Sequence, residues 1–108
     1  MKIPFIFQSN QSMAEEIALL DSGATENFIT QEKVKELKLG FHRLQAPRRV
    51  YNVDGTENNR GRITEFCTLK VLHNGQEEEQ RFFVTNLGKN DIILGYPWLK
   101  TFNPKINW

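Results

Sequence analysis

The stretch ITEFCTLKVL (residues 63–72) restricts the fold more than any other part of the sequence, because apolar and polar residues alternate along it. Successive side chains of a β-strand point to opposite faces of the sheet, so this pattern predicts a long strand. One face carries most of the apolar residues, namely Ile63, Cys67, Leu69 and Val71. The chain is therefore expected to be built on a β-sheet.

Shorter runs of β-forming residues, separated by turn signals, make up much of the remaining chain. We expect strands at residues 2–7, 16–20, 77–87 and 91–95, and a further edge strand at residues 103–108. Pro4 lacks a backbone donor, so the first strand is predicted to be an edge or terminal strand. Residues 8–12 and 73–76 have turn composition, and the pair Asp54-Gly55 predicts a hairpin.

Helices are predicted in only two places. Residues 30–39 carry a partial apolar stripe, with Thr30 suited to cap the N-terminus and Gly40 suited to end the helix. Residues 96–102 form the second candidate, and Pro97 fits its first turn. Many short strands with little helix indicate an all-β, barrel-like fold. A length of 108 residues is that of one domain, so a single domain is expected over residues 1–108.

Composition gives no indication of several classes of partner. The formal net charge is +1, so no bulk field attracts nucleic acid or an anionic membrane. No apolar run reaches the ~20 residues of a membrane span, and the N-terminal run is too short for a secretory signal. The lone Cys67 fits a reducing compartment and is expected to be packed rather than nucleophilic. His42 and His73 have no partners at ligand spacing, so neither a metal nor another cofactor is expected.

The stretch LLDSGATENFIT (residues 19–30) places an aspartate, Asp21, directly after an apolar strand and before three small residues. A carboxylate loses hydration there unless something compensates. Ser22 can hydrogen-bond backbone or a partner, and Gly23 permits close approach of backbone. One interpretation is a turn in which Asp21 only satisfies local amides. The other is a carboxylate held rigidly for chemistry.

Three segments, in order, resemble the landmarks of retropepsin-like aspartic proteases. LLDSGATENFIT is similar to their active-site motif, and DIILGYPWL (residues 91–99) is similar to their second landmark, an apolar strand ending in Gly and followed by a helix. VYNVDGTENNRGRITEF (residues 50–66) occupies the place of their flap hairpin. The second landmark together with the closing residues, DIILG.PWL…NP.I.W, is especially similar to proteases of gypsy-type long-terminal-repeat retroelements. The resemblance implies a closed β-barrel half-enzyme with a flap hairpin and one or two short helices, active as a homodimer.

The resemblance also assigns roles. It implies an aspartic endopeptidase that cleaves a retroelement polyprotein in the cytoplasm or in a particle, with Asp21 of each chain activating the water. Two carboxylates in contact cannot both ionise, so the pair shares one proton and supplies both a base and an acid. Ser22 would bond across the dimer, and an extended polypeptide substrate would be bound by the active-site loop and the flap tip. The implied substrate-binding residues are Ser22, Gly23, Ala24, Thr25, Val53, Asp54, Gly55 and Thr56.

Two departures from the family pattern stand out. Retroviral members often carry an acid directly after the Ala, whereas here Thr25 stands there and Glu26 follows. The expected flap tip also lacks the Gly-rich sequence of retroviral enzymes. Two alternatives to an active enzyme remain: a catalytically silent or domesticated module for dimerisation or peptide binding, and a domain that is folded but inactive until a precursor brings two copies together.

Other residues receive structural interpretations. Asp91 is expected to hydrogen-bond a neighbouring loop rather than take part in catalysis, and Trp98, Phe102 and Trp108 are expected in the core or in a dimer interface. A run of basic residues is expected to form a solvated face, with contact to RNA as the alternative. Its members are Lys33, Lys35, Lys38, Arg43, Arg48 and Arg49.

Overall fold

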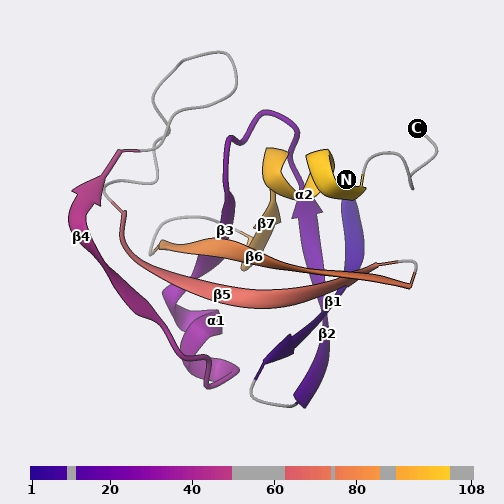
Figure 1. The fold of residues 1–108 in the computed structure, drawn as a ribbon, viewed down its shortest axis with the longest axis horizontal. Coiled ribbons are helices and arrows are strands. Elements are labelled where there is room, and N and C mark those ends of the chain that lie inside the picture. The colour runs from indigo at the N-terminus through magenta and orange to yellow at the C-terminus, as the bar shows by residue number, and fades with distance from the viewer. Residues whose placement is uncertain (10–11, 50–62, 74, 86–89, 103–108) are drawn as a thin grey trace.

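The computed structural model describes residues 1–9, 12–49, 63–73, 75–85 and 90–102. Within them strands predominate, and two short helices interrupt the strands (Figure 1). In chain order the elements are β1 (Lys2–Ser9), β2 (Ser12–Leu20), β3 (Asn27–Thr30), α1 (Gln31–Glu36), β4 (His42–Arg48), β5 (Ile63–His73), β6 (Gln76–Thr85), β7 (Ile92–Leu94) and α2 (Tyr96–Phe102). The all-β prediction is confirmed.

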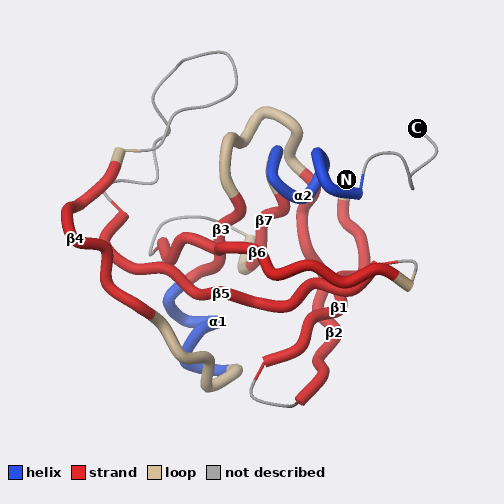
Figure 2. The backbone as a smooth tube through the Cα atoms, in the orientation of Figure 1, coloured by secondary structure: helices blue, strands red, loops and turns tan. Residues whose placement is uncertain are grey.

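Six of these strands close into a barrel. They follow one another in the order β1-β2-β7-β3-β6-β5, and pairing of β1 with β5 completes the ring, while β4 is added to β5 from outside (Figure 2). The pairs β2–β7 and β3–β6 are parallel, and the other pairs are antiparallel. Closure removes the unpaired edges that an open sheet would expose. No helix of the described residues is long and apolar enough to span a membrane.

The predicted hairpin that leads to Asp21 is present, because β1 and β2 pair from Lys2↔Leu19 to Ser9↔Ser12. Both strands are longer than expected. The prediction that the first strand is an edge holds at Pro4, which pairs only with β2, but it is wrong from Ile6 onward. There the strand also pairs with β5. Pro4, which lacks a backbone donor, therefore lies in the part of β1 that has only one neighbouring strand.

The predicted alternation is confirmed in β5 from Cys67 to Val71, where Cys67, Leu69 and Val71 are at most 1% exposed and the residues between them are exposed. Ile63 is also buried, but it packs in a different apolar cluster from these three residues. The predicted turn at residues 73–76 is also confirmed. Gly75 has φ 78°, which is the left-handed conformation that glycine adopts without strain. The strand that returns, β6, pairs with β5 over most of its length.

One prediction at the first helix needs correction. Helix α1 begins as expected, because Thr30 Oγ1 accepts a hydrogen bond from Lys33 N at 3.2 Å. It ends at Glu36 rather than at Gly40, because Lys38 adopts φ 55°. Leu39 N then bonds Val34 O at 3.0 Å and Lys38 N bonds Lys35 O at 3.2 Å, which is the Schellman arrangement.

Sequence analysis also missed strand β3, in which all four residues are buried. This strand is too short to show a period, and it runs directly into the N-cap of α1. Its neighbours β6 and β7 come from the distant end of the chain, so tertiary pairing defines it.

Two apolar clusters use opposite faces of the same strands. The larger one contains Ile29, Phe82 and Ile92 and extends to the buried Trp98 and Phe102 of α2. The expected core positions of these two aromatic residues are thus confirmed, while Trp108 lies outside the described residues. The smaller cluster is formed by the alternate residues of β3, β6 and β7, together with the first residue of β5 and the loop that follows β2: Ala24, Phe28, Ile63, Phe83 and Ile93.

Candidate active site

Asp21 lies where two parallel strands end together. Strand β2 pairs with β7 through Leu20↔Leu94, and the next residue, Asp21, donates its backbone N–H to Leu94 O at 3.0 Å. The chain then leaves the barrel as the loop of residues 21–26, which adjoins α2 at one end of the molecule (Figures 1 and 2). Because both strands belong to the closed barrel, the backbone of Asp21 has a fixed position.

The turn after Asp21 orients its carboxylate. Gly23 N donates to Asp21 Oδ1 at 3.0 Å, and Ala24 N donates to Asp21 O at 3.2 Å. A Cβ atom at Gly23 would lie 3.3 Å from Asp21 Oδ1, so a larger residue there would press on the carboxylate. Asp21 remains half-buried, and Ser22 and Gly23 are exposed. Asp21 therefore bonds an amide of its own turn, and its carboxylate also remains accessible to solvent, so the two interpretations of the sequence are compatible.

Gly95 joins this loop to the second landmark. Its N–H donates to Asn27 Oδ1 at 2.9 Å, and the next residue, Tyr96, donates its N–H to Ala24 O at 2.8 Å. A Cβ atom at Gly95 would lie 2.2 Å from Glu26 O and 2.8 Å from Ala24 O. Glycine is required here because the two backbones touch, and no side chain fits between them.

A buried polar network supports the same loop, and sequence analysis did not identify it. Asn27 is 0% exposed and donates through Nδ2 to Gln80 Oε1 at 2.9 Å. Gln80 is 6% exposed and donates to Pro97 O at 3.3 Å and to Thr101 Oγ1 at 3.2 Å. The network links β3, β6 and α2 to Gly95. A polar residue directly before the apolar pair Phe28-Ile29, in ENFIT, was the available signal.

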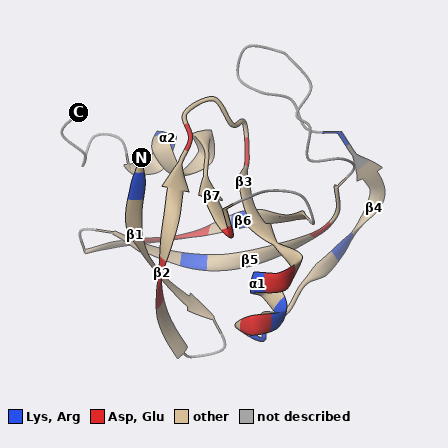
Figure 3. Ribbon diagram, turned by 180° about the vertical axis from the view of Figure 1, so that it is seen from behind, with Lys and Arg blue, Asp and Glu red and all other residues tan. Residues whose placement is uncertain are grey.

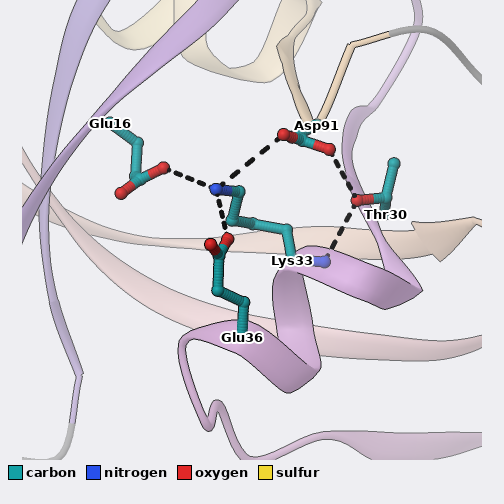
Figure 4. A network of polar contacts seen from close by, with 5 residues as sticks. All are labelled: Glu16, Thr30, Lys33, Glu36 and Asp91. Atoms are coloured by element: carbon teal, nitrogen blue, oxygen red, sulfur yellow. Dashed lines mark hydrogen bonds and ion pairs between the residues drawn. The ribbon is translucent and has the colours of Figure 1, made fainter.

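A second network, on the far side of β3, holds the strands together (Figure 4). Lys33 Nζ lies 2.8 Å from Glu16 Oε1, forms an ion pair with Glu36, and lies 3.8 Å from Asp91 Oδ2. Hydrogen bonds to Glu16 and Glu36 are the main cause that raises the pKa of Lys33 above its ordinary value. Lys33 thus connects α1 to β2, which leads to Asp21, and to the segment that precedes β7.

Asp91 takes part in this second network, but its hydrogen-bond partner is Thr30, the last residue of β3, rather than a loop. It accepts a hydrogen bond from Thr30 Oγ1 at 3.3 Å, and its backbone O accepts from Thr30 N at 2.9 Å. The basic residues divide into two groups. Lys33 is engaged with acids, whereas Lys35, Lys38, Arg43 and Arg49 are exposed.

The smaller apolar cluster provides a wall beside the Asp21 turn. Ala24 belongs to it and is 0% exposed, and Leu19 packs against it from β2. Phe28 and Ile93 contribute from β3 and β7, which pair with each other at these two residues. Ala24, Phe28 and Ile93 are at most 2% exposed, so the cluster packs against the turn and supports its position.

Five of the predicted site residues are brought together by the loop of residues 21–26: Asp21, Ser22, Gly23, Ala24 and Thr25. The loop carries acidic residues and no Lys or Arg (Figure 3). The expected flap tip, residues 53–56, lies outside the described residues. In the described part of the chain, no group of three or more His, Cys, Asp or Glu side chains is arranged to hold a metal ion.

Solved structures share this fold. The EIAV protease complexed with the inhibitor HBY-793 matches with a TM-score of 0.64 and 19% sequence identity, over 100% of this chain and 94% of that chain. The retroviral protease-like domain of Ddi1 from Leishmania major matches with a TM-score of 0.51 and 17% identity, over 95% of this chain and 76% of that chain. At these identities the likeness shows the fold alone.

The family is shown by the sequence itself. The family model of the PEG10/RTL1 protease domain matches residues 17–108, which include the Asp21 loop, the Gly95 landmark and the strands between them. The chain therefore belongs to the PEG10/RTL1 protease domain family and is a retropepsin-like protease domain of retroelement origin.

Proposed function

We propose that this domain is an aspartic endopeptidase that cleaves peptide bonds of a retroelement polyprotein and is active as a symmetric homodimer. The observation that carries the proposal is the geometry of Asp21. Its backbone is fixed at the joint end of β2 and β7, its Oδ1 accepts from Gly23 N, and its side chain is still reached by solvent. A carboxylate that served only the turn would have no need to stay accessible.

The chemistry requires a second carboxylate next to the first. Peptide hydrolysis needs a water molecule made nucleophilic and an amide made electrophilic, and one ionised carboxylate supplies only a base. A second copy related by a two-fold axis brings its own Asp21 to the same point. Two such carboxylates hold one proton between them, so one group takes a proton from water and the other donates to the amide.

The substrate is proposed to bind as an extended strand across the two loops, through backbone hydrogen bonds. Ser22 would bond across the dimer, and the exposed Gly23 and the neighbouring Thr25 would face the substrate backbone. Residues 53–56 are proposed to cover the substrate as a flap. Ala24 contributes to the apolar wall, because it is buried and its backbone N–H and C=O both bond within the chain.

Cleavage assays test the proposal directly. The purified domain is incubated at mildly acidic pH with an unstructured protein, with and without a transition-state-mimicking inhibitor of aspartic proteases. Cleavage that the inhibitor blocks, and that Asp21→Asn abolishes, is expected. The rate should follow a bell-shaped pH profile with both limbs below neutral pH, because the pair must hold one proton. Hydrolysis that survives Asp21→Asn would refute the assignment.

A catalytically silent or domesticated module is the competing interpretation. It predicts a dimer that binds peptide without cleaving it, at every protein concentration. A domain that awaits a precursor predicts instead that cleavage appears only where sedimentation shows dimers. Measuring sedimentation and cleavage over the same concentration series separates these cases.

A further inference from the structure

An exposed aromatic residue stands beside the Asp21 turn on a rigid support. Tyr96 opens α2 and is 53% exposed. Its N–H donates to Ala24 O at 2.8 Å, and the preceding Gly95 is held by Asn27 Oδ1 at 2.9 Å. The backbone of Tyr96 is therefore fixed against the loop of residues 21–26, while its ring extends into solvent.

The ring of Tyr96 does not belong to the core of its own chain. The other large apolar residues of α2 are buried, with Trp98 at 1%, Leu99 at 8% and Phe102 at 0% exposed. A single exposed aromatic residue has no meaning by itself, since folded proteins expose many apolar atoms. The location of Tyr96, on the same end of the barrel as Asp21, is what distinguishes it.

We propose that Tyr96 anchors the face through which two copies of this chain associate, with its ring buried against the second copy. This inference rests on the proposed function, in which the two Asp21 carboxylates meet on a two-fold axis. A second copy that reaches Asp21 must cover the end of the barrel where loop 21–26 and α2 adjoin (Figure 1). Because Tyr96 N bonds Ala24 O within that loop, the approaching copy also meets the ring.

Electrostatics favour such an anchor, even with one proton shared between the two Asp21 carboxyls. Loop 21–26 carries Asp21 and Glu26 and no basic residue, so two loops that face each other bring four carboxyl groups to one end (Figure 3). Like charges in contact oppose association. A tyrosine offsets this repulsion because it buries a large apolar ring while its hydroxyl keeps a polar partner. Because the interface has two-fold symmetry, Tyr96 contributes once from each chain, and a substitution removes both rings.

Sedimentation of the full chain over a concentration series tests the proposal. Tyr96→Ala is expected to raise the dimer Kd by roughly 30-fold to 1,000-fold, as removal of an interface anchor from both chains does. Tyr96→Phe should stay within about fivefold of wild type, since the ring is kept. The matched control is Phe41→Ala, because Phe41 is 50% exposed and lies in the segment between α1 and β4, away from the Asp21 loop (Figure 2).

Several results would overturn the proposal: a wild-type chain that stays monomeric at every concentration, an unchanged Kd for Tyr96→Ala, or an equal loss for Phe41→Ala. Urea unfolding of dilute Tyr96→Ala should match dilute wild type, and a large loss of stability would show instead that the ring supports the fold. Failure of the proposed function looks different. In that case no form of the chain cleaves protein, yet Tyr96→Ala still weakens the dimer.

A covalent tandem of two full chains provides a second test, because linking the chains would not restore cleavage if Tyr96 only supported the fold. With Tyr96→Ala in both copies, the tandem should cleave at chain concentrations where the unlinked variant does not, because the linker replaces the lost association by a high effective concentration. A tandem that is as inactive as the unlinked variant, beside an active wild-type tandem, would contradict the assignment.

Discussion

Gly95→Ala is expected to destabilise the domain strongly, although it adds only one methyl group. That methyl carbon would lie 2.2 Å from Glu26 O, 2.8 Å from Ala24 O and 2.9 Å from Glu26 C. All three atoms are backbone, so no flexible side chain can swing away. The backbone conformation of Gly95 is not of the left-handed kind, which leaves space as the only reason for glycine.

The magnitude follows from what must move. Overpacking of this kind costs about 1–3 kcal/mol. Separating the two backbones also strains the bonds of Gly95 N to Asn27 Oδ1 and of Tyr96 N to Ala24 O, and a buried group left unpaired costs about 1–3 kcal/mol. The lower entropy of the unfolded alanine chain returns about 0.4–1 kcal/mol. We expect a net loss of about 3–5 kcal/mol, a large part of the roughly 5–15 kcal/mol typical of a domain.

Urea unfolding at a concentration where the chain is monomeric measures this loss. With a slope of about 1–3 kcal/mol/M, the midpoint should fall by about 2 M. Gly40→Ala is the matched control, because no atom lies within 4 Å of the point that its added methyl carbon would occupy, and it should change stability by less than about 0.5 kcal/mol. A Gly95→Ala variant as stable as wild type would refute the argument that contact between these backbones fixes the Asp21 loop.

Three further predictions concern single side chains. Lys38→Gly should stabilise the domain by about 0.5–1 kcal/mol in thermal unfolding, because Lys38 holds φ 55°, whereas Lys35→Gly, within α1, should destabilise it by a similar amount. Lys33→Met should cost about 1–2 kcal/mol at pH 7, and Lys35→Met almost nothing. The pKa of Lys33 is raised in the fold, so its contribution to the free energy of unfolding is complete below the ordinary lysine pKa of about 10.4 and declines above it. The difference in stability between wild type and Lys33→Met should therefore be smaller at pH 11 than at pH 7. Burial raises the pKa of the Cys67 thiol to about 11, so the native thiol should resist labelling at pH 8. As pH rises, Cys67 loses its proton in the unfolded chain before it does so in the folded one, so the stability of wild type relative to Cys67→Ala should fall from about pH 9 to 11. Rapid labelling of the native thiol, or a stability difference that does not change with pH, would contradict this.

The sequence by itself determined the local elements and the place of Asp21 at the end of a strand. Alternation in residues 63–72 predicted the faces of β5, the β1–β2 hairpin was predicted to deliver Asp21, and Thr30 was identified as the cap of α1. These features depend on side-chain period, turn composition and capping, all of which act between residues that are close in the chain.

The tertiary structure decided the features that join distant segments. Strand β3 exists because its short backbone pairs with β6 and β7, and Gly95 is required because another backbone passes against it. The link from Asn27 to Gln80 spans 53 positions, and its two partners carry no local signal of pairing. Contacts of this kind depend on which backbones the closed barrel brings together, and no local sequence period encodes that.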